Sequence, residues 1–258
     1  MSAVEEHKAG TFCWIELGTT DTGAARNYYK DLFGWSDAAE QDYVMLKLSG
    51  KEVGGLYELT DEMRAHGVPP HWLSYVSVVS ADETAKKAES LGATILKEPF
   101  DVFAVGRMAV IQDPTGAVFA VWQPRTHIGA RVINEPGSLC WNELATNDVD
   151  AAGAFYTKLF DWGSEQREMG PITYTMFMAG DRPAGGMLKM TEEWGDIPPH
   201  WMPYLATDDC DYCAEKAKSL GAEVKVPPTD IPSVGRFAVL QDPQGAVISV
   251  IKLQEQPQ

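Results

Sequence analysis

Hydrophobic and polar side chains alternate at the start of the chain, over the sequence CWIEL. A period of two residues predicts a half-buried strand, because successive side chains of a strand point to opposite faces. The pattern predicts Cys13, Ile15 and Leu17 on one face, and Trp14 and Glu16 on the other.

A helical period follows this strand. Thr20-Asp21 provides a candidate N-cap, and Ala24–Leu32 has the apolar spacing of an amphipathic helix with Tyr28 and Tyr29 turned inward. Alternating segments near 42–48 and 52–59 then predict two strands. The first 60 residues are therefore predicted to form a βαβββ-like unit.

This order recurs along the chain, because the second half repeats the first at an offset of 127 to 131 residues. About half of the positions between His71 and Val121 are identical to their partners, which is the scale of a repeated domain. The repeated segments are CWIEL and CWNEL, PPHWLSY and PPHWMPY, and VGRMAVIQDPTGAV and VGRFAVLQDPQGAV. We predict four βαβββ-like modules, at about 11–59, 71–123, 139–190 and 200–252.

The repeat also defines the expected domains. Residues 11–123 and 139–252 are predicted to be two tandem domains, and the Pro- and Gly-containing segment 124–138 is predicted to link them. At 258 residues the chain is long enough for each half to bury its own core. The segments 60–70 and 191–199 differ between the copies and end in Pro-Pro, so we interpret them as loops and candidate lids.

Composition narrows the class of protein. An apolar fraction of 45% with 22% charged residues is typical of a globular protein, and no apolar run is long enough for a membrane span. The net charge of −16 disfavours nucleic acid and anionic membranes as partners. The N-terminus lacks the pattern of a signal peptide and the four cysteines do not suggest a disulfide framework, so a cytoplasmic location is expected.

The motifs together resemble the vicinal oxygen chelate superfamily, which includes glyoxalase I, bleomycin-resistance proteins and extradiol dioxygenases. The resemblance rests on the first strand ending in Thr-Asp or Asn-Asp, the phrases YYKDLFGW and FYTKLFDW, the helix ending in LGA, and the DP-x-G turn before the last strand. It covers residues 11 to 252 in both copies. It implies an α+β fold of two glyoxalase-like domains, each with a curled mixed sheet around a cavity.

The resemblance also implies a divalent metal in each cavity, held by His, Glu or Gln on the first and last strands of the modules. This sequence departs from that pattern. The corresponding positions hold Trp14 and Trp141, Leu73 and Met202, Ala120 and Ser249, and Gly54 and Gly185. Since these side chains are not the usual donors for a catalytic metal, we predict that the usual metal site is absent and that no cofactor is bound.

The alternation of each strand predicts what faces the cavities instead. Trp14 and Glu16 share a face, as do Trp141 and Glu143, and the strand that follows each Pro-Pro presents His71 and Tyr75, or His200 and Tyr204, in the same way. An inward carboxylate is unfavourable unless it is paired or hydrogen-bonded. Three interpretations of Glu16 and Glu143 stay open: general bases assisted by the histidines and tyrosines, ligand-orienting groups beside tryptophan walls, or members of a structural hydrogen-bond network.

Other polar candidates are weaker. Arg107 and Arg236 could bind an anionic group of a ligand, but a salt bridge within the module is favoured. Asp113 and Asp242 lie in DP-x-G turns and are interpreted as structural. The pair Cys210-x-x-Cys213 has no counterpart in the first half and is interpreted as incidental, while the repeated Cys13 and Cys140 are expected to be buried toward the helix layer.

The sequence therefore predicts a protein that binds a small organic molecule in aromatic, Glu-containing cavities. The alternative is a lyase, isomerase or other glyoxalase-like enzyme that uses Glu16 and Glu143 as general bases, or as ligands of a relocated divalent metal together with His71. Whether the chain is an enzyme stays open at this point. Fusing two copies in one chain favours a monomer with an internal pseudo-dimer, and a homodimer is the alternative.

Overall fold

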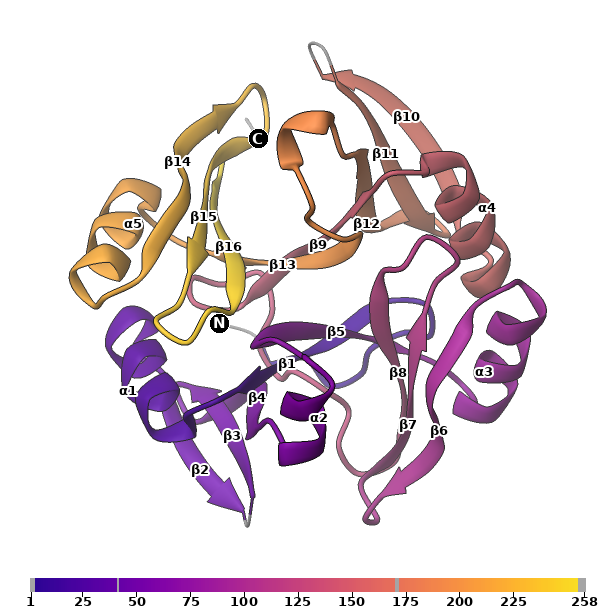
Figure 1. Cartoon of the computed structure of the whole chain (residues 1–258), viewed down its shortest axis with the longest axis horizontal. Helices are drawn as coiled ribbons and strands as arrows, with labels where there is room; N and C mark the ends of the chain where they lie inside the picture. The colour runs from indigo at the N-terminus through magenta and orange to yellow at the C-terminus, as the bar shows by residue number, and fades with distance from the viewer. Residues whose placement is uncertain (1–2, 41, 170–171, 255–258) are drawn as a thin grey trace.

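A computed structural model describes residues 3–40, 42–169 and 172–254. The chain forms two eight-stranded mixed sheets with the four longer helices on their outer sides (Figure 1), which confirms the predicted α+β class and the tandem repeat of modules. The strand order is β2-β3-β4-β1-β5-β8-β7-β6 in the first sheet and β10-β11-β12-β9-β13-β16-β15-β14 in the second.

The first sheet comes entirely from the first repeat. Its strands are β1 (Phe12–Thr19), β2 (Ser36–Glu40), β3 (Tyr43–Leu48), β4 (Lys51–Glu58), β5 (His71–Ser77), β6 (Thr94–Val102), β7 (Gly106–Gln112) and β8 (Val118–Pro124), with helices α1 (Thr22–Phe33), α2 (Asp61–Ala65) and α3 (Ala81–Ser90). Strand β2 escaped the sequence analysis because its sequence, SDAAE, lacks the β-branched and aromatic residues that mark strands.

The second sheet repeats this arrangement. Its strands are β9 (Leu139–Thr146), β10 (Gly163–Met169), β11 (Ile172–Ala179), β12 (Arg182–Lys189), β13 (His200–Ala206), β14 (Glu223–Ile231), β15 (Gly235–Gln241) and β16 (Val247–Leu253), with helices α4 (Val149–Phe160) and α5 (Cys210–Ser219) and the 3₁₀ turn η1 (Glu192–Trp194). In each sheet the first strands of two modules pair antiparallel, β1 with β5 and β9 with β13.

Local sequence explains the first helix. Asp21 caps α1 by accepting a hydrogen bond of 2.8 Å from the Ala24 amide, and Gly34 ends it in the left-handed conformation with φ of 72°. Tyr28, Tyr29 and Leu32 are buried, as the helical period predicts. In the described residues, no helix is long and apolar enough to cross a membrane.

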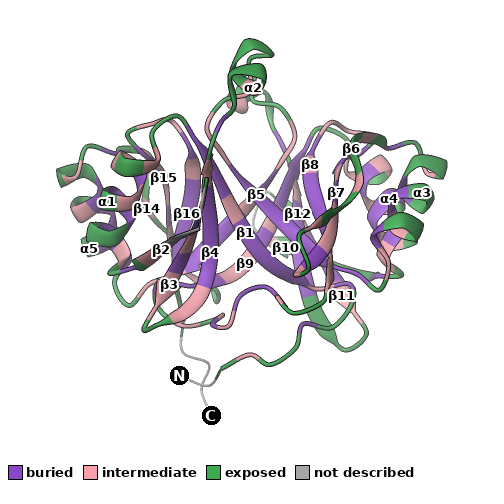
Figure 2. Cartoon of the chain, turned by 90° about the horizontal axis from the view of Figure 1, so that it is seen from below, coloured by how far each residue is buried: buried purple, intermediate pink, exposed green. Residues whose placement is uncertain are grey.

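The two larger hydrophobic cores do not follow the boundary between the repeats. Each sheet curls, the two sheets touch through β1, β5, β9 and β13, and their concave faces open in opposite directions in Figure 1. One core packs α1 and its strands against α5, β15 and β16, and the other packs α3 and its strands against α4 and β12. Figure 2 shows the buried residues concentrated in the strands, with exposed residues on the outer faces of the helices. Although each half is long enough for a core of its own, both of these cores use residues from both repeats, and a third, smaller cluster lies within the first half and the linker.

Matching hydrogen-bond chains connect the halves inside these cores. The Tyr29 hydroxyl donates to Asp242 at 2.9 Å and accepts from the indole N–H of Trp72 at 3.0 Å. Tyr156 makes the equivalent bonds to Asp113, at 2.9 Å, and from Trp201, at 2.7 Å.

The two aspartates also accept backbone N–H groups of their own turns, so their predicted structural role is confirmed. Trp72 and Trp201 accordingly lie in the cores rather than in the cavities, because strand alternation turns them away from the face of Tyr75 and Tyr204.

Candidate functional site

A glutamate lies on the concave face of each sheet, at the centre of a hydrogen-bond network. In the first sheet Tyr75 donates to one carboxylate oxygen of Glu16 at 3.0 Å and Tyr43 donates to the other at 2.9 Å. The indole N–H of Trp14 in turn donates to the Tyr43 hydroxyl at 3.2 Å. The predicted grouping of Trp14, Glu16 and Tyr75 is therefore present in the structure, and it belongs to one chain of hydrogen bonds.

The second sheet builds the same network. Tyr204 donates to Glu143 at 2.8 Å, and the indole N–H of Trp141 donates to the Tyr174 hydroxyl at 2.9 Å. A hydrogen bond from Tyr174 also acts on the Glu143 carboxylate. Two copies of one arrangement thus place a carboxylate between two phenols, with a tryptophan behind one of them.

Tyr43 and Tyr174 were not predicted as site residues, because the polar groups facing each cavity were taken from the first strand of each module alone. The segments YVM at Tyr43 and YTM at Tyr174 are repeated at an offset of 131 residues, the same offset as the paired glycines Gly54 and Gly185. The repeat therefore contained a usable signal. It was weak because a tyrosine in a strand is common for reasons of packing alone.

Burial dominates the electrostatics of both glutamates. It raises the pKa of Glu16 and Glu143, and the hydrogen bonds from the tyrosines oppose the shift. The pKa of each of the three tyrosines Tyr43, Tyr75 and Tyr204 is raised well above its usual value, first by burial and then by the nearby carboxylate. The phenols therefore remain protonated donors, and the carboxylates act as hydrogen-bond acceptors with enhanced basicity.

The histidines lie beside these networks without bonding to the glutamates. His71 pairs in register with Gly18, two residues along β1 from Glu16, and a Cβ on Gly18 would come within 3.0 Å of the His71 ring. Nδ1 of His71 donates to the Pro69 carbonyl at 2.8 Å. His200 makes the same 2.8 Å bond to Pro198.

These bonds fix the tautomer of both imidazoles, because a carbonyl oxygen can only accept a hydrogen bond from Nδ1. Burial lowers the pKa of His71 and His200, so the rings are neutral at pH 7. With Nδ1 carrying the proton, Nε2 of each ring is left with a lone pair. Each site therefore adds a neutral acceptor to its carboxylate, which fits either ligand binding or proton transfer.

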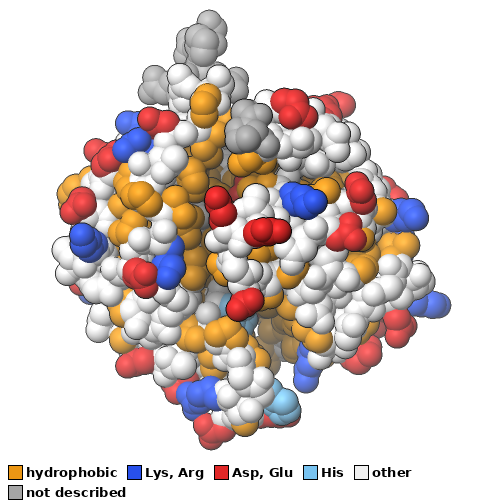
Figure 3. All heavy atoms as spheres, turned by 45° about the horizontal axis from the view of Figure 1, so that its top comes forward, with side chains coloured by type: hydrophobic (Ala, Val, Ile, Leu, Met, Phe, Trp, Pro, Cys, Tyr) orange, Lys and Arg blue, Asp and Glu red, His pale blue; other side chains and the backbone are white. Residues whose placement is uncertain are grey.

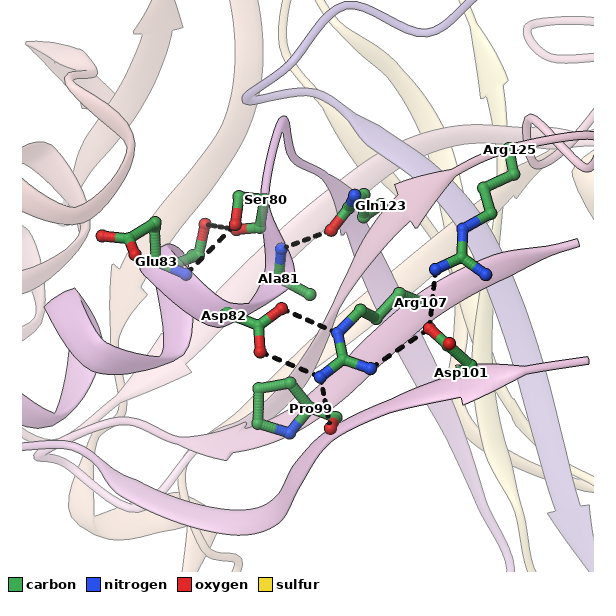
Figure 4. A network of polar contacts seen from close by, with 10 residues as sticks. Ser80, Ala81, Asp82, Glu83, Pro99, Asp101, Arg107, Gln123 and Arg125 are labelled. Atoms are coloured by element: carbon green, nitrogen blue, oxygen red, sulfur yellow. Dashed lines mark hydrogen bonds and ion pairs between the residues drawn. The ribbon is translucent and has the colours of Figure 1, made fainter. Parts of the chain in front are cut away.

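Arg107 and Arg236 lie outside these sites. Both face the helix layer, where Arg107 makes two hydrogen bonds to Asp82, of 2.7 and 2.9 Å, and one of 3.1 Å to Asp101 (Figure 4). Arg236 makes the equivalent bonds to Asp211 and Asp230. The salt-bridge interpretation is confirmed, and the ligand-binding interpretation has no support from this placement because these carboxylates engage the guanidinium groups.

The expected position of Cys13 was wrong. The pairing of β1 with β5 shifts between Phe12 and Trp14, and this bulge turns Cys13 toward the cluster formed by Trp14, Leu73 and Tyr75 on the concave side. Cys140 lies at the equivalent shift in the second sheet. Cys210 and Cys213 are buried among core residues, and burial raises the thiol pKa to about 12 and about 11 respectively, which suits an inert packing role.

The residues present do not fit the metal site that the fold family implies. Within residues 3–40, 42–169 and 172–254, no three His, Cys, Asp or Glu side chains come together in a group that could hold a metal ion. The nearest partners of Glu16 and Glu143 are phenol hydroxyls, which act here as donors. Ala120 and Leu73, at two of the expected ligand positions, are buried apolar residues.

The paired βαβββ modules and the curled sheets are an architecture that one class of proteins shares. The chain belongs to the Glyoxalase/Bleomycin resistance protein/Dioxygenase superfamily, whose sequence model matches residues 11–121 and 129–250.

Individual relatives extend over nearly the whole chain. It is 40% identical over 254 residues to the Mycobacterium tuberculosis protein named "Putative glyoxylase CFP32", with 96% of each chain covered. It is 34% identical over 261 residues to the anthracycline biosynthesis protein DnrV of Streptomyces peucetius, covering 95% of this chain and 94% of that one.

Solved structures share the fold at low sequence identity. The Mn(II)-bound glyoxalase from Novosphingobium aromaticivorans superimposes with a TM-score of 0.68 at 15% identity, covering 96% of this chain and 84% of the other. The 2,3-dioxygenase LapB from Pseudomonas sp. KL28 gives a TM-score of 0.67 at 12% identity, covering 100% and 95%. At these identities the likeness establishes the architecture alone.

Proposed function

We propose that this protein binds a small organic molecule on the concave faces of its sheets, without the superfamily's usual metal site. The observation that carries the proposal is the duplicated network in which a partly buried carboxylate accepts hydrogen bonds from phenols beside a tryptophan. Apolar walls with a few oriented polar groups are typical of sites for small organic ligands. The name of the relative DnrV supports a hydroxylated aromatic ligand, since anthracyclines belong to that class.

A binding experiment with a simple probe tests this function. We expect 2-naphthol to bind the wild-type chain in isothermal titration calorimetry, and 2-methoxynaphthalene, which cannot donate its hydrogen bond to a carboxylate, to bind about tenfold more weakly. The double variant Glu16→Gln/Glu143→Gln should lose the preference for the phenol. Glu98→Gln, the same change at an exposed position, is the matched control. A wild-type chain that binds neither compound, or both equally, contradicts the proposal.

The raised pKa of both glutamates supports a second candidate function, general-base catalysis. The reaction would be that of a glyoxalase-like lyase or isomerase, in which a carboxylate removes a proton from a carbon next to a carbonyl and returns it. Hydroxyacetone in D₂O tests this step, because the base would replace its C–H protons by deuterium. We expect exchange catalysed by the wild type to disappear in the Glu16→Gln/Glu143→Gln variant, and an unchanged rate would exclude the glutamates as bases.

A further inference from the structure

The two sites have the same network but different surroundings, which points to a division of roles. We propose that the second half alone binds the ligand, one hydroxylated aromatic molecule per chain, and that the 125–133 segment of the linker occupies the equivalent space of the first half. This inference rests on the proposed function and narrows it to one site.

Aromatic contacts hold the linker over the first site. The ring of His127 meets Trp14 edge-on, with centroids 4.8 Å apart, and lies 5.8 Å from the ring of Trp122. The indole N–H of Trp122 donates to the His127 carbonyl at 2.9 Å. The Trp14 ring, expected to form a wall for a ligand, is thus already covered by a side chain of the same protein.

Backbone contacts fix the next residues of the linker against β1 and β4. The Ala130 amide donates to the Cys13 carbonyl at 2.8 Å, and the Arg131 amide donates to the Glu52 carbonyl at 2.7 Å. Nε2 of His7 donates to the Ala130 carbonyl at 2.8 Å. Gly129 permits this approach, because its φ is +107° and a Cβ there would lie 2.4 Å from the Cys13 carbonyl oxygen.

The equivalent side chains of the two halves also differ in burial. In the first half Trp14 is 4% exposed and Leu73 is 6% exposed, and Ala130 and Ile133 of the linker pack into the same cluster. Their counterparts in the second half, Trp141 and Met202, are both only partly buried. The second network is therefore the one whose tryptophan still has accessible surface for a ligand.

The side chains of the second site indicate what it would bind. Glu143 and the neutral Nε2 of His200 are both acceptors, so a ligand must bring donors such as phenolic hydroxyls. The partly buried Trp141, Met176 and Met202 offer apolar surface for a ring. A negatively charged ligand is disfavoured by Glu143 and by the net charge of −16.

The approach to this site is apolar as well. Three apolar side chains are exposed there, Ile197 by 48%, Val234 by 36% and Leu253 by 51%. They belong to the η1 connection (residues 190–199, between β12 and β13), the β14–β15 turn and the end of β16. These segments surround the opening of the second sheet in Figure 1. Figure 3 shows hydrophobic side chains gathered along a hollow on this face. Trp194 of the η1 connection lies with its ring centroid 6.3 Å from that of His200, so this connection borders the site.

Methionines provide a reporter in each site without any substitution. Met45 and Met108 pack against the linker-covered cluster of the first half, and Met108 Sδ lies 3.9 Å from the Tyr75 hydroxyl. Met176, the counterpart of Met45, and Met202, which pairs with Glu143, line the second site. Methyl NMR spectra of the full chain with ¹³C-methyl methionine, titrated with 2-naphthol, therefore distinguish the two sites.

We expect the Met176 and Met202 methyl signals to shift and those of Met45 and Met108 to stay in place, with calorimetry giving one 2-naphthol per chain. In Glu143→Gln the affinity should fall about tenfold, as loss of a hydrogen bond to a charged group implies. Shifts of Met45 or Met108, or two molecules bound per chain, would overturn the inference and leave the proposed function intact. A wild-type chain that binds no 2-naphthol refutes both, and calorimetry alone reports that result.

Discussion

The hydrogen-bond chains between the halves allow a sharp test of what holds the fold together. Tyr29→Phe removes one hydroxyl that donates to Asp242, 4% exposed, and accepts from the Trp72 indole. Losing a hydrogen bond to a charged group costs about 1.5–3 kcal/mol, and leaving a buried N–H without an acceptor costs about 1–3 kcal/mol. Since the two penalties overlap when the site relaxes, we expect the free energy of unfolding to fall by about 3 kcal/mol.

Urea denaturation followed by tryptophan fluorescence measures this loss. Tyr28→Phe is the matched control, because Tyr28 lies on the same helix and is 5% exposed. The pKa of Tyr28 is raised first by burial, and no hydrogen bond contributes to the shift. We expect less than about 1 kcal/mol there. Tyr156→Phe, the change in the twin chain, should cost about as much as Tyr29→Phe. A loss below about 1 kcal/mol for Tyr29→Phe would refute the argument that these chains lock the halves together.

Two further predictions concern pH and packing. Burial lowers the pKa of four histidines, His7, His71, His127 and His200, so their stabilisation is complete above about pH 6.5 and is lost as the pH falls, because the unfolded chain then binds more protons. The urea midpoint should therefore drop less between pH 7.5 and 5.5 in His200→Asn than in the wild type, and an equal drop contradicts this. Glu16 and Glu143, whose pKa is raised, oppose the drop, but they do so equally in the wild type and the variant. Gly18→Ala should destabilise by about 1–3 kcal/mol in thermal unfolding, because the new Cβ would lie 2.9 Å from Leu59 Cδ2, and a neutral effect would disprove the crowding.

Much of the fold could be predicted from the sequence because its signals are local. The Asp21 cap, the inward tyrosines of α1 and the Asp113 turn depend only on neighbouring residues and on the helical or strand period. The assembly of the cores could not be predicted in this way. Nothing local indicates that Tyr29 bonds to Asp242 rather than to a group of its own half.

The candidate sites show the same limit. Strand alternation correctly placed Trp14 and Glu16 on one face, but a single bulge reversed the expectation for Cys13 beside them. The partner of Trp14 on the linker, His127, could not be foreseen because it follows from the path of a segment without a periodic pattern.

The crossing of the cores between the repeats also sets an order for folding. Apart from Phe12, one core uses only residues 76–201, whereas the other joins residues 15–72 to residues 132–250. Their central bonds differ in the same way, since Tyr156 reaches Asp113 over 43 positions and Tyr29 reaches Asp242 over 213. Loop closure costs more entropy as the separation grows. The core formed by the middle of the chain can therefore assemble first. The other core includes residues of β16, so during synthesis it can form only after this last strand has been made.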